Sequence, residues 1–149
     1  MRPPSLPYMS LLWLLIAPLA ACGAEPMPQA TKNPSLYSGH RAMTDLPAPV
    51  VELVAAVTAG DTDAFLALFI EDGVVDDWGR RFTGRASIRH WSDREFIGAK
   101  GMLTPHKVNR SGDTVTVDAG WKSDFYSGDS RFVFVLEGDA IREMRIVAH

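Results

Sequence analysis

The chain has 149 residues, of which 46% are hydrophobic and 22% are charged, and its formal net charge is −3. This length suits one folded domain, and the composition is that of a globular protein rather than a disordered one. Lysine and arginine residues do not cluster along the chain, which argues against a nucleic-acid-binding surface. No apolar run reaches the roughly 20 residues of a membrane-spanning helix.

The N-terminal segment predicts export and a lipid anchor. Leu11 to Ala21 is almost wholly apolar, and its length suits a signal peptide better than a membrane span. The run ends in Leu19-Ala20-Ala21-Cys22, which resembles the lipobox of bacterial lipoproteins, where the cysteine is acylated and becomes the new N-terminus. Each buried methylene of an acyl chain is worth about 0.8 kcal/mol, so several chains make a lasting anchor. The alternative is an ordinary secretion signal followed by an unused thiol.

These patterns divide the chain into three segments. Residues 1–21 are the expected signal peptide, and residues 22–44, which are rich in proline and small residues, are an expected flexible tether. Residues 45–149 form the expected domain. Gly23, rather than aspartate, follows the cysteine, and the lipoprotein resemblance then implies the bacterial cell envelope, at the outer membrane facing the periplasm.

The first predicted helix opens the domain. Apolar residues recur at helical spacing from Leu46 to Val57. Asp45 is the expected N-cap, and Gly60 is expected to end the helix.

A second, shorter helix is expected around the apolar segment Phe65–Phe69, with Asp61 or Asp63 as its cap. Glu71-Asp72-Gly73 is then expected to turn the chain into the next strand.

The most informative stretch is VVDDWGRRFTGRASIRHW, residues 74–91. A valine pair predicts a strand that runs into Asp76 and Asp77. Successive residues of a strand face opposite sides, so one of these two carboxylates is expected to face the apolar interior. A third helix is expected from Arg85 to about Phe96.

After Gly98 the hydrophobic period becomes that of strands. Four strands are expected, at 102–108, 114–122, 131–136 and 141–147, with turns at 111–113, 127–129 and 137–139. Pro105 predicts an edge strand or a bulge. This order predicts an α+β fold, in which three N-terminal helices pack on a cone-shaped, curved antiparallel sheet. Residues 132–136 are apolar on both faces, which favours a second subunit on the outer face and hence a homodimer.

Several of these segments resemble the SnoaL-like group of the nuclear transport factor 2-like superfamily over residues 45–147. The resemblance implies a cone with a pocket at its wide end, and usually a dimer. It rests on Ala59-Gly60-Asp61, Phe65–Phe69, Val75–Gly79, Gly84, Ile88 and Trp91.

Within this superfamily, ketosteroid isomerase offers a comparison for the site. The resemblance places its general base at Asp77. Its two oxyanion donors fall at Leu53 and near Phe132, which cannot donate hydrogen bonds, and this argues against steroid isomerisation.

Asp77 is therefore the candidate catalytic residue. Apolar neighbours would desolvate its carboxylate and make it a better base. The alternative is that Asp77 caps a turn or pairs with Arg80, Arg81 or Arg145. The candidate ligand-binding residues are Trp78, Trp91, His106, Trp121 and Tyr126.

Three functions remain open at this point: a domain that binds a small apolar or aromatic molecule, an acid-base enzyme such as an isomerase, cyclase or dehydratase, and a protein-interaction module. The four histidines are scattered and Cys22 is assigned to the lipid anchor, so no metal site is expected. No cofactor is expected either, because the chain has no glycine-rich phosphate loop.

Overall fold

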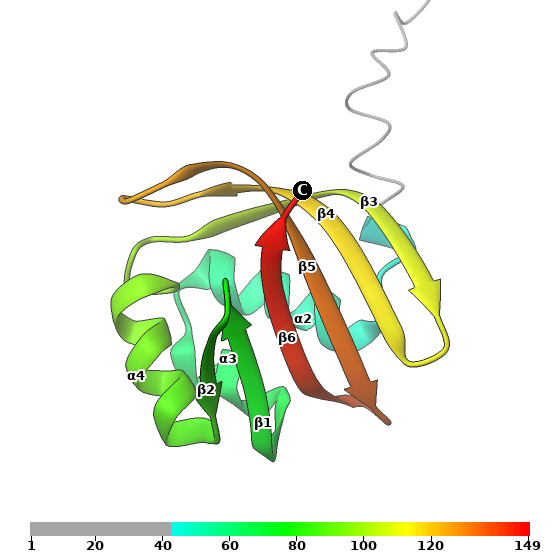
Figure 1. The fold of residues 1–149 in the computed structure, drawn as a ribbon, viewed down its shortest axis with the longest axis horizontal. Coiled ribbons are helices and arrows are strands. Elements are labelled where there is room, and N and C mark those ends of the chain that lie inside the picture. Colours follow the sequence, from blue (N-terminus) through cyan, green and yellow to red (C-terminus); the bar gives the residue numbers. More distant parts are fainter. Residues whose placement is uncertain (1–42) are drawn as a thin grey trace, which may run out of the picture. The chain divides into compact units, whose positions relative to one another are not determined.

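The computed structural model describes residues 43–149 (Figure 1). The predicted signal peptide, Cys22 and nearly all of the predicted tether lie outside the described residues. Within this part of the chain, a curved sheet of six strands carries helices on one of its faces. None of the described helices is long and apolar enough to cross a membrane.

The strands follow the order β2-β1-β6-β5-β4-β3 across the sheet. They are β1 (Phe69–Asp77), β2 (Arg80–Thr83), β3 (Met102–Ser111), β4 (Thr114–Lys122), β5 (Ser127–Glu137) and β6 (Ala140–Ala148). The predicted α+β fold is confirmed, with one change in the sheet. It is mixed rather than wholly antiparallel, because β1 runs parallel to β6 and pairs Asp77 with Ile146.

Three helices are described: α2 (Ala48–Ala59), α3 (Thr62–Ala67) and α4 (Arg85–Glu95). Helix α2 ends at Gly60, whose left-handed backbone (φ 71°) suits glycine, as predicted. Asp61 caps α3, and its carboxylate accepts a hydrogen bond of 2.9 Å from the backbone nitrogen of Ala64. The N-cap predicted at Asp45 is wrong, because Pro47 is the N-cap of α2, and Pro49 lies in its first turn, where proline is well tolerated.

Two predicted boundaries are also wrong. Phe69 opens β1 rather than ending a helix, and residues 71–73 lie within β1, where its pairing with β6 shifts register. Residues 127–129 belong to β5, and the preceding turn lies at 123–126 instead. Glycine and aspartate favour turns, but strands also tolerate them: residues 71–73 lie at an irregularity in the pairing of β1, and residues 127–129 pair continuously with β4.

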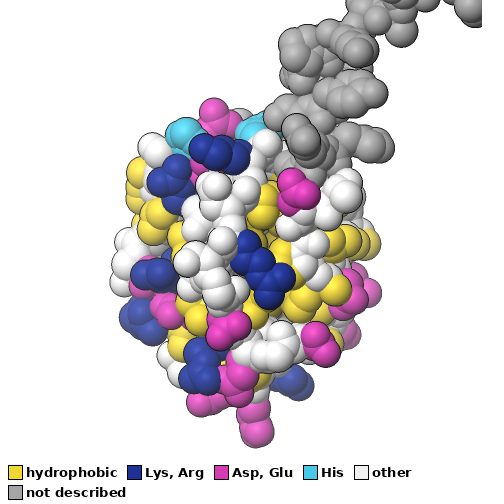
Figure 2. All heavy atoms as spheres, turned by 90° about the vertical axis from the view of Figure 1, so that its right-hand side faces the viewer, with side chains coloured by type: hydrophobic (Ala, Val, Ile, Leu, Met, Phe, Trp, Pro, Cys, Tyr) yellow, Lys and Arg dark blue, Asp and Glu magenta, His cyan; other side chains and the backbone are white. Residues whose placement is uncertain are grey.

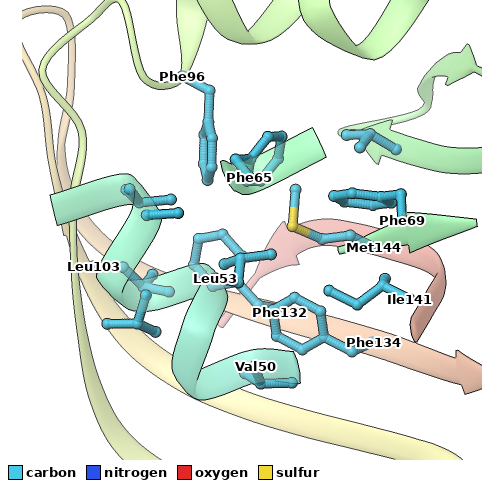
Figure 3. Packing of buried hydrophobic residues seen from close by; sticks show 14 of the residues in the cluster. Val50, Leu53, Phe65, Phe69, Phe96, Leu103, Phe132, Phe134, Ile141 and Met144 are labelled. Atoms are coloured by element: carbon cyan, nitrogen blue, oxygen red, sulfur yellow. The ribbon is translucent and has the colours of Figure 1, made fainter. Parts of the chain in front are cut away.

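The core lies between the helices and the inner face of the sheet (Figure 3). Leu53 from α2 and Phe65 from α3 are fully buried. In Figure 3 Leu53 lies near Phe132 of β5, and the ring of Phe65 lies 5.1 Å from that of Phe69 of β1. Burial of one phenylalanine side chain contributes about 2–3 kcal/mol, so these contacts hold the helices on the sheet.

The edge strand β3 carries Pro105, as predicted. Pro105 has no N–H to donate, and the register with β4 shifts between Pro105 and Lys107. The prediction of an edge strand or a bulge is confirmed on both counts.

The outer face of the sheet is more polar. Asp118 of β4 and Arg131 of β5 are cross-strand partners there, and Arg131 Nε donates a hydrogen bond of 2.6 Å to Asp118 Oδ1. This hydrogen bond lowers the pKa of the Asp118 carboxyl below its ordinary value, against the opposing effect of burial. In the view of Figure 2, basic and acidic side chains are interspersed with hydrophobic ones rather than gathered by sign.

Asp118 therefore gives a pH-dependent contribution to stability. Its pKa is lower in the folded chain, so the stabilisation is present above the pKa of the unfolded chain, about 4, and is lost as the pH falls through the folded value. We expect Asp118→Asn to lower the free energy of unfolding by about 1 kcal/mol at neutral pH. Urea denaturation should show this difference shrinking in acid. Asp139→Asn, at an exposed turn, is the control, and a pH-independent difference for Asp118→Asn would contradict the assignment.

Candidate functional site

A cavity of about 230 Å³ lies at one end of the sheet, where β1 and α4 end and the β4–β5 hairpin begins. Figure 1 shows α4 and this hairpin on the same side of the molecule. One wall is formed by Asp77, Trp78, Trp91, Glu95 and Phe96. The sheet contributes Trp121, Ser130, Phe132 and Ile146, and the hairpin contributes Ser123, Phe125 and Tyr126.

Stacked aromatic rings run through this region. Trp91 and Phe96 stack with ring centroids 4.8 Å apart, and Phe96 and Trp121 are nearly parallel at 4.5 Å. Phe82 extends the stack at one end, 5.7 Å from Trp91. Offset stacking of this kind contributes about 0.5–1.5 kcal/mol per pair beyond burial, so the wall of the cavity is stiff.

Two glycines let aromatic rings approach the backbone at the cavity. A Cβ at Gly101 would overlap the Trp121 ring and lie 2.8 Å from the carbonyl oxygen of Phe96. A Cβ at Gly128 would overlap the ring of Tyr126. The backbone at these two positions therefore sets where Trp121 and Tyr126 lie.

Asp77 is the last residue of β1, and its side chain is 15% exposed. The indole Nε1 of Trp91, a buried residue, donates a hydrogen bond of 3.1 Å to Asp77 Oδ2. Arg80 Nη2 donates to the same oxygen. Asp77 therefore lines the cavity and also forms the ion pair with Arg80 that the sequence left as an alternative. Its other oxygen, Oδ1, accepts no hydrogen bond from the described residues.

Asp76 lies on the opposite face of β1, as the alternation predicts. Its carboxylate accepts a hydrogen bond of 2.7 Å from the backbone nitrogen of Gly79 and pairs with Arg81 at 3.4 Å. The two adjacent acids thus serve different ends: Asp76 fixes the β1–β2 turn, and Asp77 faces the cavity.

Glu95 is a second acid of the cavity, and the sequence did not identify it as a site residue. Arg80 Nη2 also bonds to Glu95 Oε2, at 2.8 Å. This hydrogen bond lowers the pKa of Glu95 and, with Asp77, raises the pKa of Arg80. Glu95 ends α4 next to the buried Phe96, and this position at the end of an apolar helix face was the only signal for it.

The structure brings together most of the predicted ligand-binding residues. Trp91 is buried in the wall, Trp121 is partly buried, and Trp78 and Tyr126 are 60% and 52% exposed at the mouth. Trp78 has a positive φ of 54°, an uncommon conformation for a bulky residue, which turns the chain directly after Asp77.

His106 is the exception, and its predicted place in the pocket is not supported. It follows the buried Pro105 on β3, so strand alternation turns it to the outer face. There its Nε2 lies 3.8 Å from Asp129 Oδ1.

Ser130 is a further polar residue of the cavity that the sequence reasoning missed as such. It is 2% exposed and lies on the same face of β5 as Phe132. Its hydroxyl makes no hydrogen bond to any described residue. A serine among alternating aromatic residues on the inner face of a strand was the available signal.

The described part of the chain shows no cluster of side chains that could ligate a metal ion. Residues 43–149 contain no group of three or more histidine, cysteine, aspartate or glutamate side chains placed to hold a metal ion. The cavity offers instead two carboxylates, hydroxyl groups and aromatic faces.

Comparison with known families assigns this architecture. The family model of the SnoaL-like domain matches residues 50–148. The chain belongs to the SnoaL-like domain family. It matches no curated protein by sequence.

Solved structures support the SnoaL-like assignment. A proposed polyketide cyclase from Sinorhizobium meliloti is 27% identical with a TM-score of 0.66, and the match covers 70% of this chain and 97% of that one. A protein with a ketosteroid isomerase-like fold from Catenulispora acidiphila, in complex with trimethylamine, is 26% identical with a TM-score of 0.57, over 67% and 84% of the chains.

A ketosteroid isomerase from a Mycobacterium species is similar to this SnoaL-like domain in fold alone. It is 18% identical with a TM-score of 0.61, over 68% of this chain and 91% of that one. Here Leu53 is buried in the core and Phe132 lines the cavity, so neither position supplies an oxyanion donor.

The packing of Trp121 against Gly101 can be tested by substitution. We expect Gly101→Ala to displace the indole and lower the free energy of unfolding by about 2 kcal/mol, because the added methyl has no space. Near-ultraviolet circular dichroism should change with it. Gly112→Ala, in open space at φ 58°, is the control, with a loss of about 1 kcal/mol and no change in the aromatic signal. An unchanged spectrum for Gly101→Ala would contradict this account of the wall.

Proposed function

We propose that this SnoaL-like domain binds a small, mostly apolar molecule in the cavity, with Asp77 fixing one polar group of it. The observation that carries the proposal is a carboxylate in the lining of an aromatic cavity, with its Oδ1 not bonded to any described residue. Two relatives support small-molecule chemistry in this family, the proposed polyketide cyclase and the protein solved with trimethylamine.

The volume of the cavity limits the ligand. A cavity of about 150 Å³ accommodates benzene in another protein. The 230 Å³ found here therefore suits a molecule of one or two rings. A four-ring steroid would extend through the mouth past Trp78 and Tyr126.

Binding can be tested by filling the cavity. We expect native mass spectrometry of the purified full-length chain, or a thermal shift with small aromatic compounds, to detect a bound ligand. A ligand at 100 times its Kd stabilises the fold by about 2.7 kcal/mol. Ser130→Phe, which fills the cavity from β5, should abolish binding, while Thr104→Phe on the exposed edge of β3 should not. Equal binding by Ser130→Phe would remove the cavity from the proposal.

The second candidate function is an acid-base enzyme, of the isomerase, cyclase or dehydratase type, using Asp77. The free Oδ1 favours it, because that oxygen could take a proton from a ligand. Trp91 and Arg80 only donate hydrogen bonds, so neither of them can take the proton onward from Asp77. Asp77→Asn separates the two functions: it should abolish turnover by an enzyme while the ligand still binds.

We also propose that the domain is anchored in the bacterial cell envelope through acylated Cys22, at the outer membrane facing the periplasm. The support is the lipobox-like segment Leu19–Cys22. We expect the wild-type chain to sediment with membranes and to carry the mass of the acyl chains. Cys22→Ala should lack that added mass, and a wild-type chain without acyl mass would contradict the anchor.

A homodimer is proposed through the outer face of the sheet, where Val133 and Val135 of β5 are only half-buried in one chain. The same face could instead dock another envelope protein. Crosslinks placed at Val133 distinguish the two, since the homodimer requires capture of a second copy of this chain.

A further inference from the structure

The charged residues that line the cavity are all acidic. Its twelve lining residues include two acids, Asp77 and Glu95, and no lysine, arginine or histidine, while seven of them are aromatic. An anionic ligand would therefore enter an apolar site whose only charged walls repel it, and it would find no cationic partner to offset its lost hydration.

The base next to the cavity does not reverse this sign. Arg80 pairs with both acids from outside the lining, and its side chain is 53% exposed. Its Cζ lies 5.7 Å from the centre of the Phe82 ring. Arg94 of α4 also acts on Glu95 through space, but like Arg80 it lies outside the lining. The charged groups that line the cavity itself are therefore both carboxylates, and the Oδ1 of Asp77 remains open to a ligand.

Aromatic faces add to this field. The face of an aromatic ring carries partial negative charge and attracts ammonium and guanidinium groups, most strongly in tryptophan. Trp78 and Tyr126 lie at the mouth of the cavity and Trp121 in its wall, within the same lining as Asp77.

We propose that the cavity selects a small organic cation, a primary to quaternary amine carrying at most one or two rings. This inference rests on the proposed function and assigns the charge of its ligand. The amine lies among the aromatic rings facing Asp77 and Glu95, and the apolar part of the molecule occupies the space near Phe132.

The test compares three benzyl compounds of different charge on the purified full-length chain in nonionic detergent, by isothermal titration calorimetry at neutral pH. They are benzyltrimethylammonium, its uncharged carbon isostere neopentylbenzene, and the anion phenylacetate. We expect the cation to bind on the order of tenfold more tightly than the isostere, and the anion to bind most weakly. Added salt should weaken binding of the cation and leave the isostere unaffected.

Charge variants at the cavity test the same inference without altering its shape. Glu95→Gln should weaken the cation several-fold and leave the isostere unchanged, while Arg80→Gln should strengthen the cation. Glu137→Gln is the matched control, because Glu137 also pairs with an arginine, Arg142, at the far end of β5, roughly 20 Å along the strand from Ser130. It should change neither affinity.

The outcomes separate this inference from the proposed function. Binding of the isostere or the anion as tight as that of the cation would overturn the charge selection and leave a small-molecule site standing. Binding of none of the three probes, with no thermal shift from any small aromatic compound, would overturn both. Loss of cation binding in Glu137→Gln would move the site away from the cavity and contradict the inference.

Discussion

The hydrogen bond from the Trp91 indole nitrogen to Asp77 Oδ2 joins α4 to the end of β1, and the cavity depends on it. The Trp91 ring is stacked between Phe82 and Phe96, so its indole N–H is buried among apolar groups. The carboxylate of Asp77 is the hydrogen-bond acceptor for this N–H. Leaving such a donor unpaired costs about 1–3 kcal/mol. The same hydrogen bond holds the Asp77 carboxylate against aromatic rings. Without a hydrogen-bond donor, a carboxylate would be unfavourable in such an apolar place.

The remaining polar contacts of the site follow from this one. Arg80 bridges Asp77 and Glu95 and so closes the gap between the β1–β2 turn and the end of α4. Because β1 runs parallel to β6, Asp77 lies beside Ile146 and close to the inner face of β5, where Ser130 enters the cavity. One edge of the cavity is thus held by the ion pairs of Arg80 with Asp77 and Glu95. The opposite edge is the β4–β5 hairpin, in which Phe125 and Tyr126 are exposed.

Local patterns in the sequence predicted the parts of this structure that depend on neighbours along the chain. Strand alternation separated Asp76 from Asp77, and the helix expected from Arg85 is α4, which buries Ile88 and Trp91. Contacts between distant segments were not predictable in the same way. Glu95 meets Arg80 only through the packing of α4 on β2. Ser130 faces inward because β5 begins at Ser127, whereas Gly128 and Asp129 had suggested a turn there. His106 was misplaced because it faces away from the side on which Pro105 is buried, and which face of β3 is buried depends on packing against distant segments.

The most direct measurement of the central claim is the solvent exchange of the tryptophan indole protons, followed by nuclear magnetic resonance. The account predicts that the Trp91 indole proton exchanges far more slowly than that of Trp78, which is 60% exposed, and that Asp77→Ala accelerates the exchange of Trp91 alone. Exchange of Trp91 as fast as that of Trp78, or exchange unaffected by the loss of the carboxylate, would show that Asp77 is not held at the wall of the cavity.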